Sequence, residues 1–225
     1  MSDVELDLTA AALATLPVFP LPRVVLFPGA EVPLHLFEPR YRQLTEHCLR
    51  TPGRAMAVTR IAPGHEEAQR GDPPFAEVAT VGTIVHHEAM LDGTHHILLR
   101  TLARVRLDEL SGAALPFRLA KAVQLPTQQA GGVAKHDVRA LRQCAHMVVQ
   151  AVRRRHPDFC LGLAELSDTE ALIDRIADGC IAHPDTRQAI LEAQALPKRL
   201  SLVTSALSEV LAHFPHDAWA GSLQA

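Results

Sequence analysis

The sequence is poor in lysine, cysteine and aromatic residues. The first two shortages exclude kinds of functional site, and the third limits the composition of the core. Only three residues are lysine, and none of them follows a glycine, so the G-x-x-x-x-G-K loop that holds nucleotide phosphates is absent. The four cysteines form no C-x-x-C pair, which argues against a zinc knuckle or a thioredoxin-like site. Aromatic residues make up only 4% of the chain, so the core must be mostly aliphatic.

The sequence also lacks a targeting segment, a long apolar run and a strong charge of either sign. The first 16 residues are acidic, without the positive start of a signal peptide, and no stretch is apolar for long enough to span a membrane. Together with the unpaired cysteines, this predicts a cytoplasmic protein with no membrane partner. The net charge of -3 and the pI near 6.5 argue against nucleic acid as a partner.

What is present predicts an α+β chain with a β-rich half followed by a helical half. Residues 1–15 are interpreted as a flexible lead-in. Short apolar runs broken by Pro and Gly fill residues 16–125, residues 126–134 have the composition of a linker, and helical spacing of apolar residues begins at 135 and continues toward 225. Many short strands with turn residues between them indicate a small barrel or sandwich.

Three local patterns predict particular turns and caps. Pro28-Gly29 suits a type II turn, because proline presets φ and glycine accepts a positive φ. Asp92-Gly93 predicts a two-residue type I′ hairpin turn. In the helical half, Ser167 followed by Glu170 predicts a capping box at the start of a helix.

The run LPVFPLPRVVLFPGAEVPLHLFEPRYRQL (Leu16–Leu44) resembles the opening of the Lon protease N-terminal, substrate-recognition domain family. Val81-Gly82-Thr83, Arg104 and a tail that includes Arg199 match later segments of that family, although its glycine ahead of the arginine is replaced by Thr101 or Leu102. The residues that carry the opening motif include Pro20, Phe27, Pro28, Gly29, Phe37, Glu38, Arg40 and Tyr41.

The resemblance implies a PUA-like β pseudo-barrel followed by a helical bundle, and a protein-binding role without catalysis. The Gly-Pro-Ser-Ala-Gly context of the family's proteolytic serine is absent, so we expect a non-enzymatic module with no cofactor and no nucleotide. Its expected partner is an unfolded polypeptide segment or another protein. The motif residues are expected to be structural: Phe37 and Tyr41 should fill the barrel, while Glu38 and Arg40 should bond to backbone or to each other.

Histidines are the chemically unusual feature, with 13 in the chain. With a two-residue turn at Asp92-Gly93, strand alternation would place His86, Glu88 and His95 on one face. One carboxylate and two imidazoles can ligate zinc, but His86 and His95 would lie several residues out of register with each other. The favoured interpretation is therefore a polar face with no metal.

Two alternatives remain open on the sequence alone. One is an RNA-binding module, because PUA-like barrels are often used in that way, although a basic surface rich in aromatic residues is missing. The other is a metal-dependent enzyme that uses the His86–His96 hairpin. The run Arg153-Arg154-Arg155 is more simply interpreted as a helix end whose charge complements the helix dipole.

Overall fold

The computed structural model describes residues 8–67, 72–112, 114–129 and 132–214. The chain divides into two compact units, Met1–Pro126 and Thr127–Ala225, and each is described by itself. Residues 1–7 of the predicted lead-in, residues 130 and 131 of the predicted linker, and the last eleven residues lie outside the described part. No helix among the described residues is long and apolar enough to cross a membrane.

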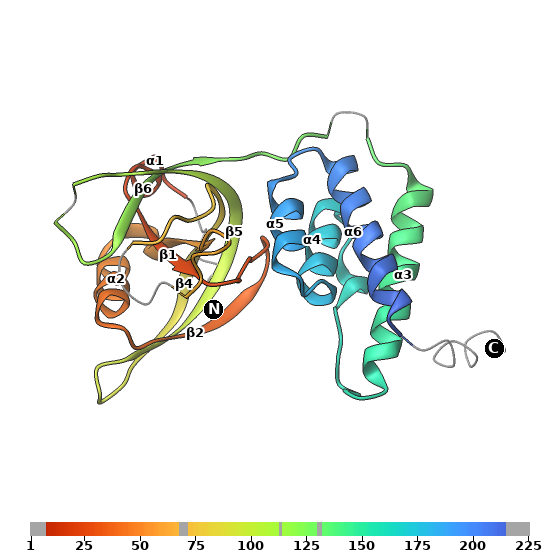
Figure 1. Ribbon diagram of the computed structural model, residues 1–225, viewed down its shortest axis with the longest axis horizontal. Coiled ribbons are helices and arrows are strands. Elements are labelled where there is room, and N and C mark those ends of the chain that lie inside the picture. The colour runs from red at the N-terminus through yellow and green to blue at the C-terminus, as the bar shows by residue number, and fades with distance from the viewer. Residues whose placement is uncertain (1–7, 68–71, 113, 130–131, 215–225) are drawn as a thin grey trace. The chain divides into compact units, whose positions relative to one another are not determined.

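In the described part of the first unit, a sheet of six strands closes into a small barrel with β2 at its edge (Figure 1). The sheet order is β2-β5-β4-β3-β1-β6, and a further pairing of β5 with β6 closes five of the strands into a ring. The long strand β5 makes this possible, because its first half pairs with β2 and its second half pairs with β6. The strands are β1 (Leu16–Leu21), β2 (Glu31–Leu36), β3 (Ala55–Arg60), β4 (Val78–Ala89), β5 (His95–Glu109) and β6 (Arg118–Gln124).

Two hydrophobic clusters hold the barrel and its helices together. Helix α2 (Pro39–Arg50) begins with proline, which needs no hydrogen-bond partner there, and it buries Leu44 and Cys48 beside Met56 in one cluster. Small residues of all five ring strands form the second cluster, and Leu13 of the short helix α1 (Ala10–Ala14) packs against it. Alanine and valine at these positions let the strands of a narrow ring approach one another. A 3-10 turn, η1 (Pro52–Arg54), connects α2 to β3.

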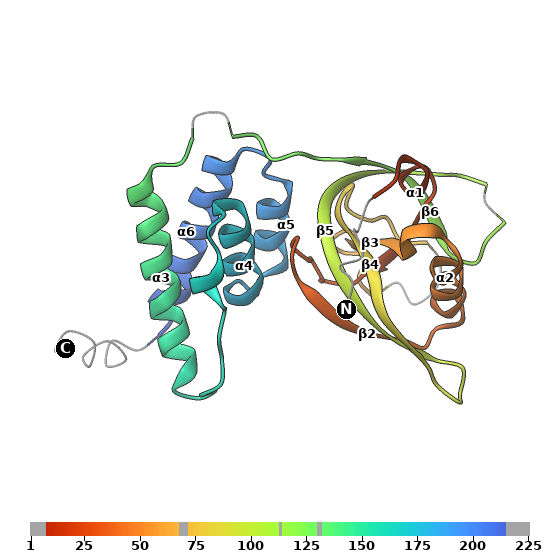
Figure 2. The ribbon, with the colours of Figure 1, turned by 180° about the vertical axis from the view of Figure 1, so that it is seen from behind.

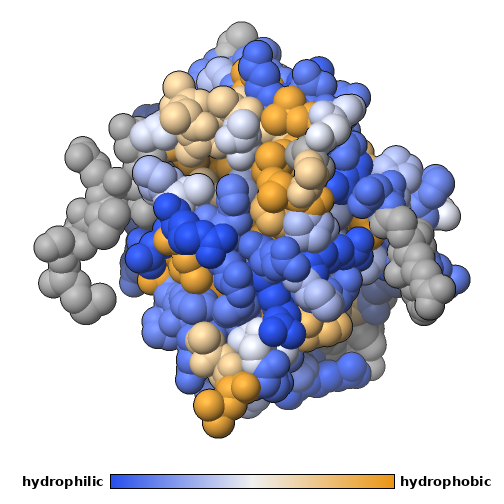
Figure 3. Space-filling view, turned by 90° about the vertical axis from the view of Figure 1, so that its left-hand side faces the viewer, coloured by the Kyte–Doolittle hydropathy of each residue, from blue (hydrophilic) through white to orange (hydrophobic). Residues whose placement is uncertain are grey.

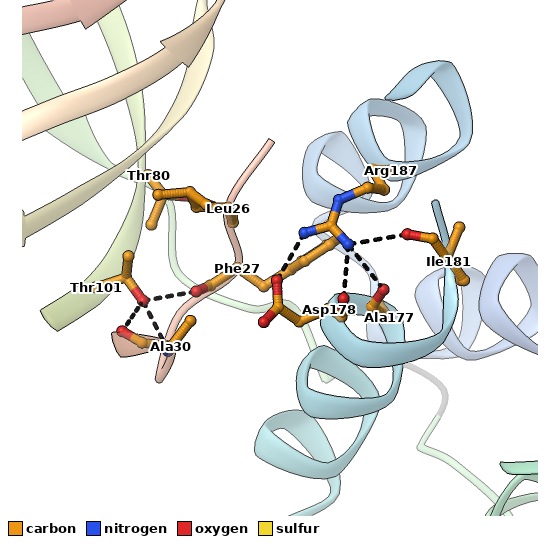
Figure 4. Close-up of polar contacts among 9 residues, drawn as sticks. All are labelled: Leu26, Phe27, Ala30, Thr80, Thr101, Ala177, Asp178, Ile181 and Arg187. Carbon is orange, nitrogen blue, oxygen red and sulfur yellow. Dashed lines mark hydrogen bonds and ion pairs between the residues drawn. The ribbon is translucent and has the colours of Figure 1, made fainter. Parts of the chain in front are cut away.

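The turn at Pro28-Gly29 has the positive φ that the sequence predicts, 84° at Gly29. A side chain from β5 completes it (Figure 4). The Thr101 hydroxyl lies 2.7 Å from the Phe27 carbonyl oxygen, to which it donates, and it accepts from the Ala30 amide at 2.8 Å. The hydroxyl therefore bridges the two ends of the turn, and all its partners are buried.

The β4–β5 hairpin differs from the prediction by one residue. Met90 and Thr94 are bonded across the end, and the Gly93 amide donates to the Met90 carbonyl, so the loop is Leu91-Asp92-Gly93. Gly93 has a φ of 80°, whereas Asp92 does not adopt a positive φ. This is a three-residue loop with its glycine in the left-handed region, and not the predicted type I′ turn. The Thr94 amide and the Thr94 hydroxyl both donate to the Asp92 carboxylate, and these two hydrogen bonds stabilise the three-residue loop.

Among its described residues, the second unit is a bundle of four helices, which with the barrel confirms the predicted α+β class (Figures 1 and 2). Helix α3 packs mainly along α6, and α4 and α5 also contact α6. The core is aliphatic, including Leu141, Ile173, Ile190 and Val203. The elements are α3 (Lys135–Arg153), the 3-10 turn η2 (Leu163–Glu165), α4 (Thr169–Cys180), α5 (Pro184–Glu192) and α6 (Leu196–Ala212).

Both ends of α4 are capped by side chains, but not by the predicted capping box. The N-cap is Asp168, whose carboxylate accepts from the Ala171 amide at 2.8 Å, and not Ser167. At the other end, Arg187 donates to the carbonyls of Asp178 and Ile181 at 2.8 and 2.9 Å (Figure 4). The free carbonyls of the helix terminus are thereby satisfied.

Glu170, the expected partner of the capping box, instead belongs to a buried network around Arg199. The Arg199 guanidinium, which is fully buried, donates to Glu170 Oε1 at 3.0 Å and to Thr127 Oγ1 at 3.1 Å. Asp174 lies 3.7 Å away. Gln128 also pairs with the start of α6 through Leu196. Residues 127 and 128, part of the predicted linker, are thus bonded into the helical unit.

Candidate functional site

One outer face of the barrel gathers exposed side chains from three adjacent strands. Leu34 and Leu36 of β2 point toward the core, so their neighbours in β2 point outward, as strand alternation requires. The strand register places these neighbours in rows with β5 and β4. We call this surface the hairpin-end face; its residues are Pro33, His35, Phe37, His86, Glu88, Met90, Leu91, His96 and Leu98.

The end of this face nearest the hairpin loop is apolar. Phe37 directly follows Leu36, which pairs with His95, so it lies level with the loop. The Phe37 side chain is 61% exposed, Leu91 at the loop tip is fully exposed, and Met90 is also exposed. Figure 3 shows a hydrophobic projection at the lower end of the barrel surface, at the height of the β4–β5 hairpin in Figure 1. Exposed apolar groups gathered in this way are typical of binding surfaces.

Aromatic rings continue the face along β2 and β5. The His35 ring lies with its centroid 4.5 Å from His96, its partner in the strand pair, and 5.7 Å from Phe37. Pro33 and Leu98 form the next pair along the strands. Imidazole and phenyl rings offer flat surfaces that can contact apolar groups without specific hydrogen bonds. The face therefore suits shape-tolerant contacts with a chain rather than chemistry on a substrate.

A second pair of histidines lies on the other side of the hairpin. His87 Nε2 and His95 Nδ1 are 2.9 Å apart. His95 is buried, and its Nε2 atom is 3.9 Å from Glu46 Oε1, beyond hydrogen-bond distance. Burial lowers the pKa of His87, and the neighbouring His95, Arg54 and His86 lower it further. The lowered pKa means that His87 favours its neutral form more than an ordinary histidine does.

The three side chains that the sequence offered as metal ligands do not lie on one face of the hairpin. Since Glu88 pairs with His96, and Ala89 with His95, the carboxylate of Glu88 lies on the hairpin-end face and His95 lies on the opposite one. The expectation that His86, Glu88 and His95 share a face was wrong because the loop has three residues and moves the register by one. Within the described ranges, no group of three or more His, Cys, Asp and Glu side chains could hold a metal ion.

The residues of the opening motif take different positions. Pro20 lies in β1 opposite Thr59. Tyr41 is buried in the core, where its ring meets Phe19 edge-on at 4.6 Å, and burial raises its pKa. Glu38 and Arg40 bond to each other at 3.0 Å, one of the two arrangements expected.

Phe37 corrects the prediction that two aromatic residues fill the barrel. Leu36 occupies the buried position at the end of β2 and is only 1% exposed, so the next residue must point outward. The hairpin-end face was therefore not predicted from the sequence. The alternation in Glu31–Leu36 carried the signal, because Pro33, His35 and Phe37 share one parity and the aliphatic residues share the other.

A separate hollow of the barrel unit lies beside α1 and η1. Its volume is about 130 Å³, and small residues such as Ala12 and Ala55 line it together with His47 and Pro17. That volume holds a few water molecules and is well below that of ordinary ligand pockets. The hairpin-end face is therefore the stronger candidate.

The barrel, its added edge strand and the four-helix bundle define a PUA-like β unit joined to a helical unit. A family model described as the ATP-dependent protease La (LON) substrate-binding domain matches residues 15–209, and the chain belongs to this family. The resemblance predicted from the opening motif is thereby confirmed.

Similar proteins and structures agree with this assignment. Lon protease 2 of Syntrophobacter fumaroxidans is 35% identical over 97 residues, which are 43% of this chain and 12% of that protein. The N-terminal domain of Mycobacterium avium complex Lon protease superposes with a TM-score of 0.65 at 14% identity, over 87% of this chain and 98% of that one. The Lon N-terminal domain protein from Xanthomonas campestris gives a TM-score of 0.61 at 22% identity, over 90% and 99%.

The chain spans only a part of its full-length relatives. It covers between 12% and 25% of the length of the Lon proteases of Syntrophobacter fumaroxidans, Bdellovibrio bacteriovorus and Xanthomonas oryzae. The two structural neighbours, by contrast, are covered almost completely. The family therefore supports a substrate-recognition module for this chain, and not the activity of a complete protease.

Proposed function

We propose that this chain is a non-catalytic module that binds unfolded segments of other proteins through the hairpin-end face. The observation that carries the proposal is the grouping of Phe37, Met90 and Leu91 at one end of the barrel, all of them exposed. Membership of a substrate-binding family makes a protein substrate the natural ligand class.

The chemistry of the face fits an apolar, extended ligand. Phenylalanine, methionine and leucine side chains gain free energy when apolar groups cover them, about 1.5–3 kcal/mol for each side chain that becomes fully buried. Methionine adapts its shape to different partners. Binding that depends on a few such contacts is expected to be weak, with a Kd around micromolar or higher.

The double variant Phe37→Ser/Leu91→Ser tests the proposal. A fluorescently labelled, permanently unfolded polypeptide is titrated with the protein, and binding is measured by anisotropy. We expect the variant to bind at least about tenfold more weakly, because each lost side chain contributes on the order of 1 kcal/mol or more of contact free energy. Since both positions are exposed, its melting temperature should stay close to that of the unmodified chain.

The matched control is Leu115→Ser/Val123→Ser, which removes two apolar side chains exposed elsewhere on the barrel unit. This control should bind as the unmodified chain does, and a folded form of the ligand protein should not bind. Equal weakening in both double variants would show that the hairpin-end face has no special role. Salt-sensitive binding of structured RNA, without binding of the unfolded polypeptide, would instead support the RNA-binding alternative.

A further inference from the structure

Positive charge is concentrated on a single helix of the second unit. The segment 135–155, which is α3 and the two residues after it, holds six of the 22 lysine and arginine residues of the chain but only one of the 25 acidic residues. The rest of that unit has the opposite balance, with four basic and ten acidic residues. An acidic chain thus carries one strongly basic element.

The geometry of α3 places three of these six basic residues on one exposed side. Its buried residues, among them Leu141 and Val148, face the other helices of the bundle. The exposed residues recur every three or four positions and so form a stripe along the opposite side. We call it the α3 stripe; its members are Lys135, Arg139, Gln143, His146, Gln150 and Arg153. At 1.5 Å per residue the stripe is about 27 Å long.

Hydrogen bonds distinguish the basic side chains that bind carbonyl groups of the bundle from those that are exposed to a partner. Arg142 lies beside the stripe and donates to the Leu163 carbonyl at 2.8 Å, so it holds the segment before α4. Arg153 donates through Nε to Phe159 at 2.7 Å, which fixes its direction. His146 and Gln150 form a pair at 2.8 Å. Lys135 and Arg139 are exposed at the start of the stripe.

We propose that the α3 stripe binds an acidic segment of a partner protein, about the length of a five-turn helix. Charge complementarity carries this proposal. Arginine guanidinium groups bind carboxylates through two parallel hydrogen bonds, and the polar positions between them suit a wet, mixed interface. Met147 is exposed beside the stripe and adds an apolar contact that suits an amphipathic acidic segment rather than a plain polyanion.

The surroundings of the stripe favour an acidic polypeptide over nucleic acid. A nucleic acid extends its phosphates well beyond one helix, and charges within about 8–10 Å of one another still interact at physiological salt. By sequence, the rest of the unit holds ten acidic and only four basic residues, and this balance disfavours a ligand whose phosphates extend past the helix. A short segment confines its charge to the stripe. The few aromatic residues of the chain offer little surface on which bases could stack.

The test compares the unmodified chain with Lys135→Gln/Arg139→Gln in binding a labelled, glutamate-rich 20-residue peptide. The control variant Arg106→Gln/Lys198→Gln removes the same charge from exposed positions away from the stripe. We expect the peptide to bind the unmodified chain and the control equally, and Lys135→Gln/Arg139→Gln at least fivefold more weakly, with a shallower dependence on salt. Circular dichroism confirms that all three chains are folded.

Three results would overturn the proposal. They are no binding by the unmodified chain, equal weakening in both variants, and tighter binding of a 20-nucleotide RNA that Lys135→Gln/Arg139→Gln also weakens. This inference is independent of the hairpin-end face, so Phe37→Ser/Leu91→Ser should leave binding of the acidic peptide unchanged. Failure of one proposal is thereby distinguishable from failure of the other.

Discussion

A single hydroxyl group joins two parts of the barrel that are 71 residues apart in the sequence. Thr101 bridges the Phe27 carbonyl and the Ala30 amide, so the turn that contains Pro28 and Gly29 is completed from β5. Thr101 is one of the two positions, with Leu102, at which the family resemblance leads one to expect a glycine. In this chain the change is compatible with the fold because the side chain adds bonds that the turn itself does not make.

The Thr101→Val variant tests the importance of this bridge. Valine has nearly the same shape but no hydroxyl, so the Ala30 amide and the Phe27 carbonyl would each lose a buried partner. We expect the free energy of unfolding to fall by about 1–3 kcal/mol. Denaturant titration measures it, and Thr101→Ser, which keeps the hydroxyl, should retain most of the stability. Equal stability of the valine variant would show that the bridge adds nothing.

Individual side-chain positions were predictable only where the pattern around them was long enough. The helical spacing of Tyr41, Leu44 and Cys48 indicates one buried face, and all three are buried. Phe37 stands one residue beyond a short strand, where an aromatic residue suits either side. The hydrophobicity of Phe37 predicts a buried side chain, whereas strand alternation after the buried Leu36 requires the Phe37 side chain to point outward.

At the scale of elements, the order of strands and helices follows from the sequence, but their exact ends do not. Asp92-Gly93 favours a tight turn, yet the Asp92 carboxylate binds Thr94 and the glycine alone takes the left-handed conformation. The resulting register shift of one residue places His96, and not His95, on the same face of the hairpin as Glu88. Similarly, Ser167 and Asp168 are both good N-caps, and only the structure distinguishes them.

The network around Arg199 connects α4, α6 and residue Thr127. Arg199→Ala would remove the guanidinium that pairs with the carboxylates of Glu170 and Asp174, and Asp174 is only 1% exposed. An uncompensated buried charge costs about 3–5 kcal/mol, so we expect the helical unit to unfold at a much lower denaturant concentration.

The neighbouring Lys198 provides the control for Arg199→Ala, since it is exposed on the same helix. Lys198→Ala should change the free energy of unfolding by no more than about 0.5 kcal/mol. Circular dichroism at 222 nm follows both variants, because most of the helix lies in this unit. A similar small effect of the two substitutions would contradict the structural role of the network.

For the whole molecule, the order of motifs along the chain identified the family before any coordinates did. Proline and glycine positions between short apolar runs carry that information, because they mark turns that the fold needs. The choice of binding surface was not predictable in the same way. It depends on which strand lies at the edge of the barrel. It also depends on two separate segments, one with Phe37 and one with Met90 and Leu91, that only the register brings together.

The chain is expected to have no nucleotide chemistry of its own. None of its lysines follows a glycine, so no backbone cradle with a lysine is available for phosphates. Titration calorimetry with ATP and magnesium should show no heat of binding, and no phosphate should be released. A known P-loop ATPase in the same buffer serves as the positive control, and stoichiometric binding of ATP by this chain would refute the expectation.

Cys48 is buried in the barrel unit, and Cys180 is half-buried in the helical unit. Burial raises the pKa of Cys48, in the barrel unit, to about 12, and that of Cys180, in the helical unit, to about 11. At neutral pH these thiols hold almost no thiolate, the form that reacts with alkylating reagents. The exposed Cys160 should therefore be alkylated first. Later labelling of Cys48, which is fully buried, would then occur at the rate at which the barrel unit opens, so mass spectrometry can time that opening.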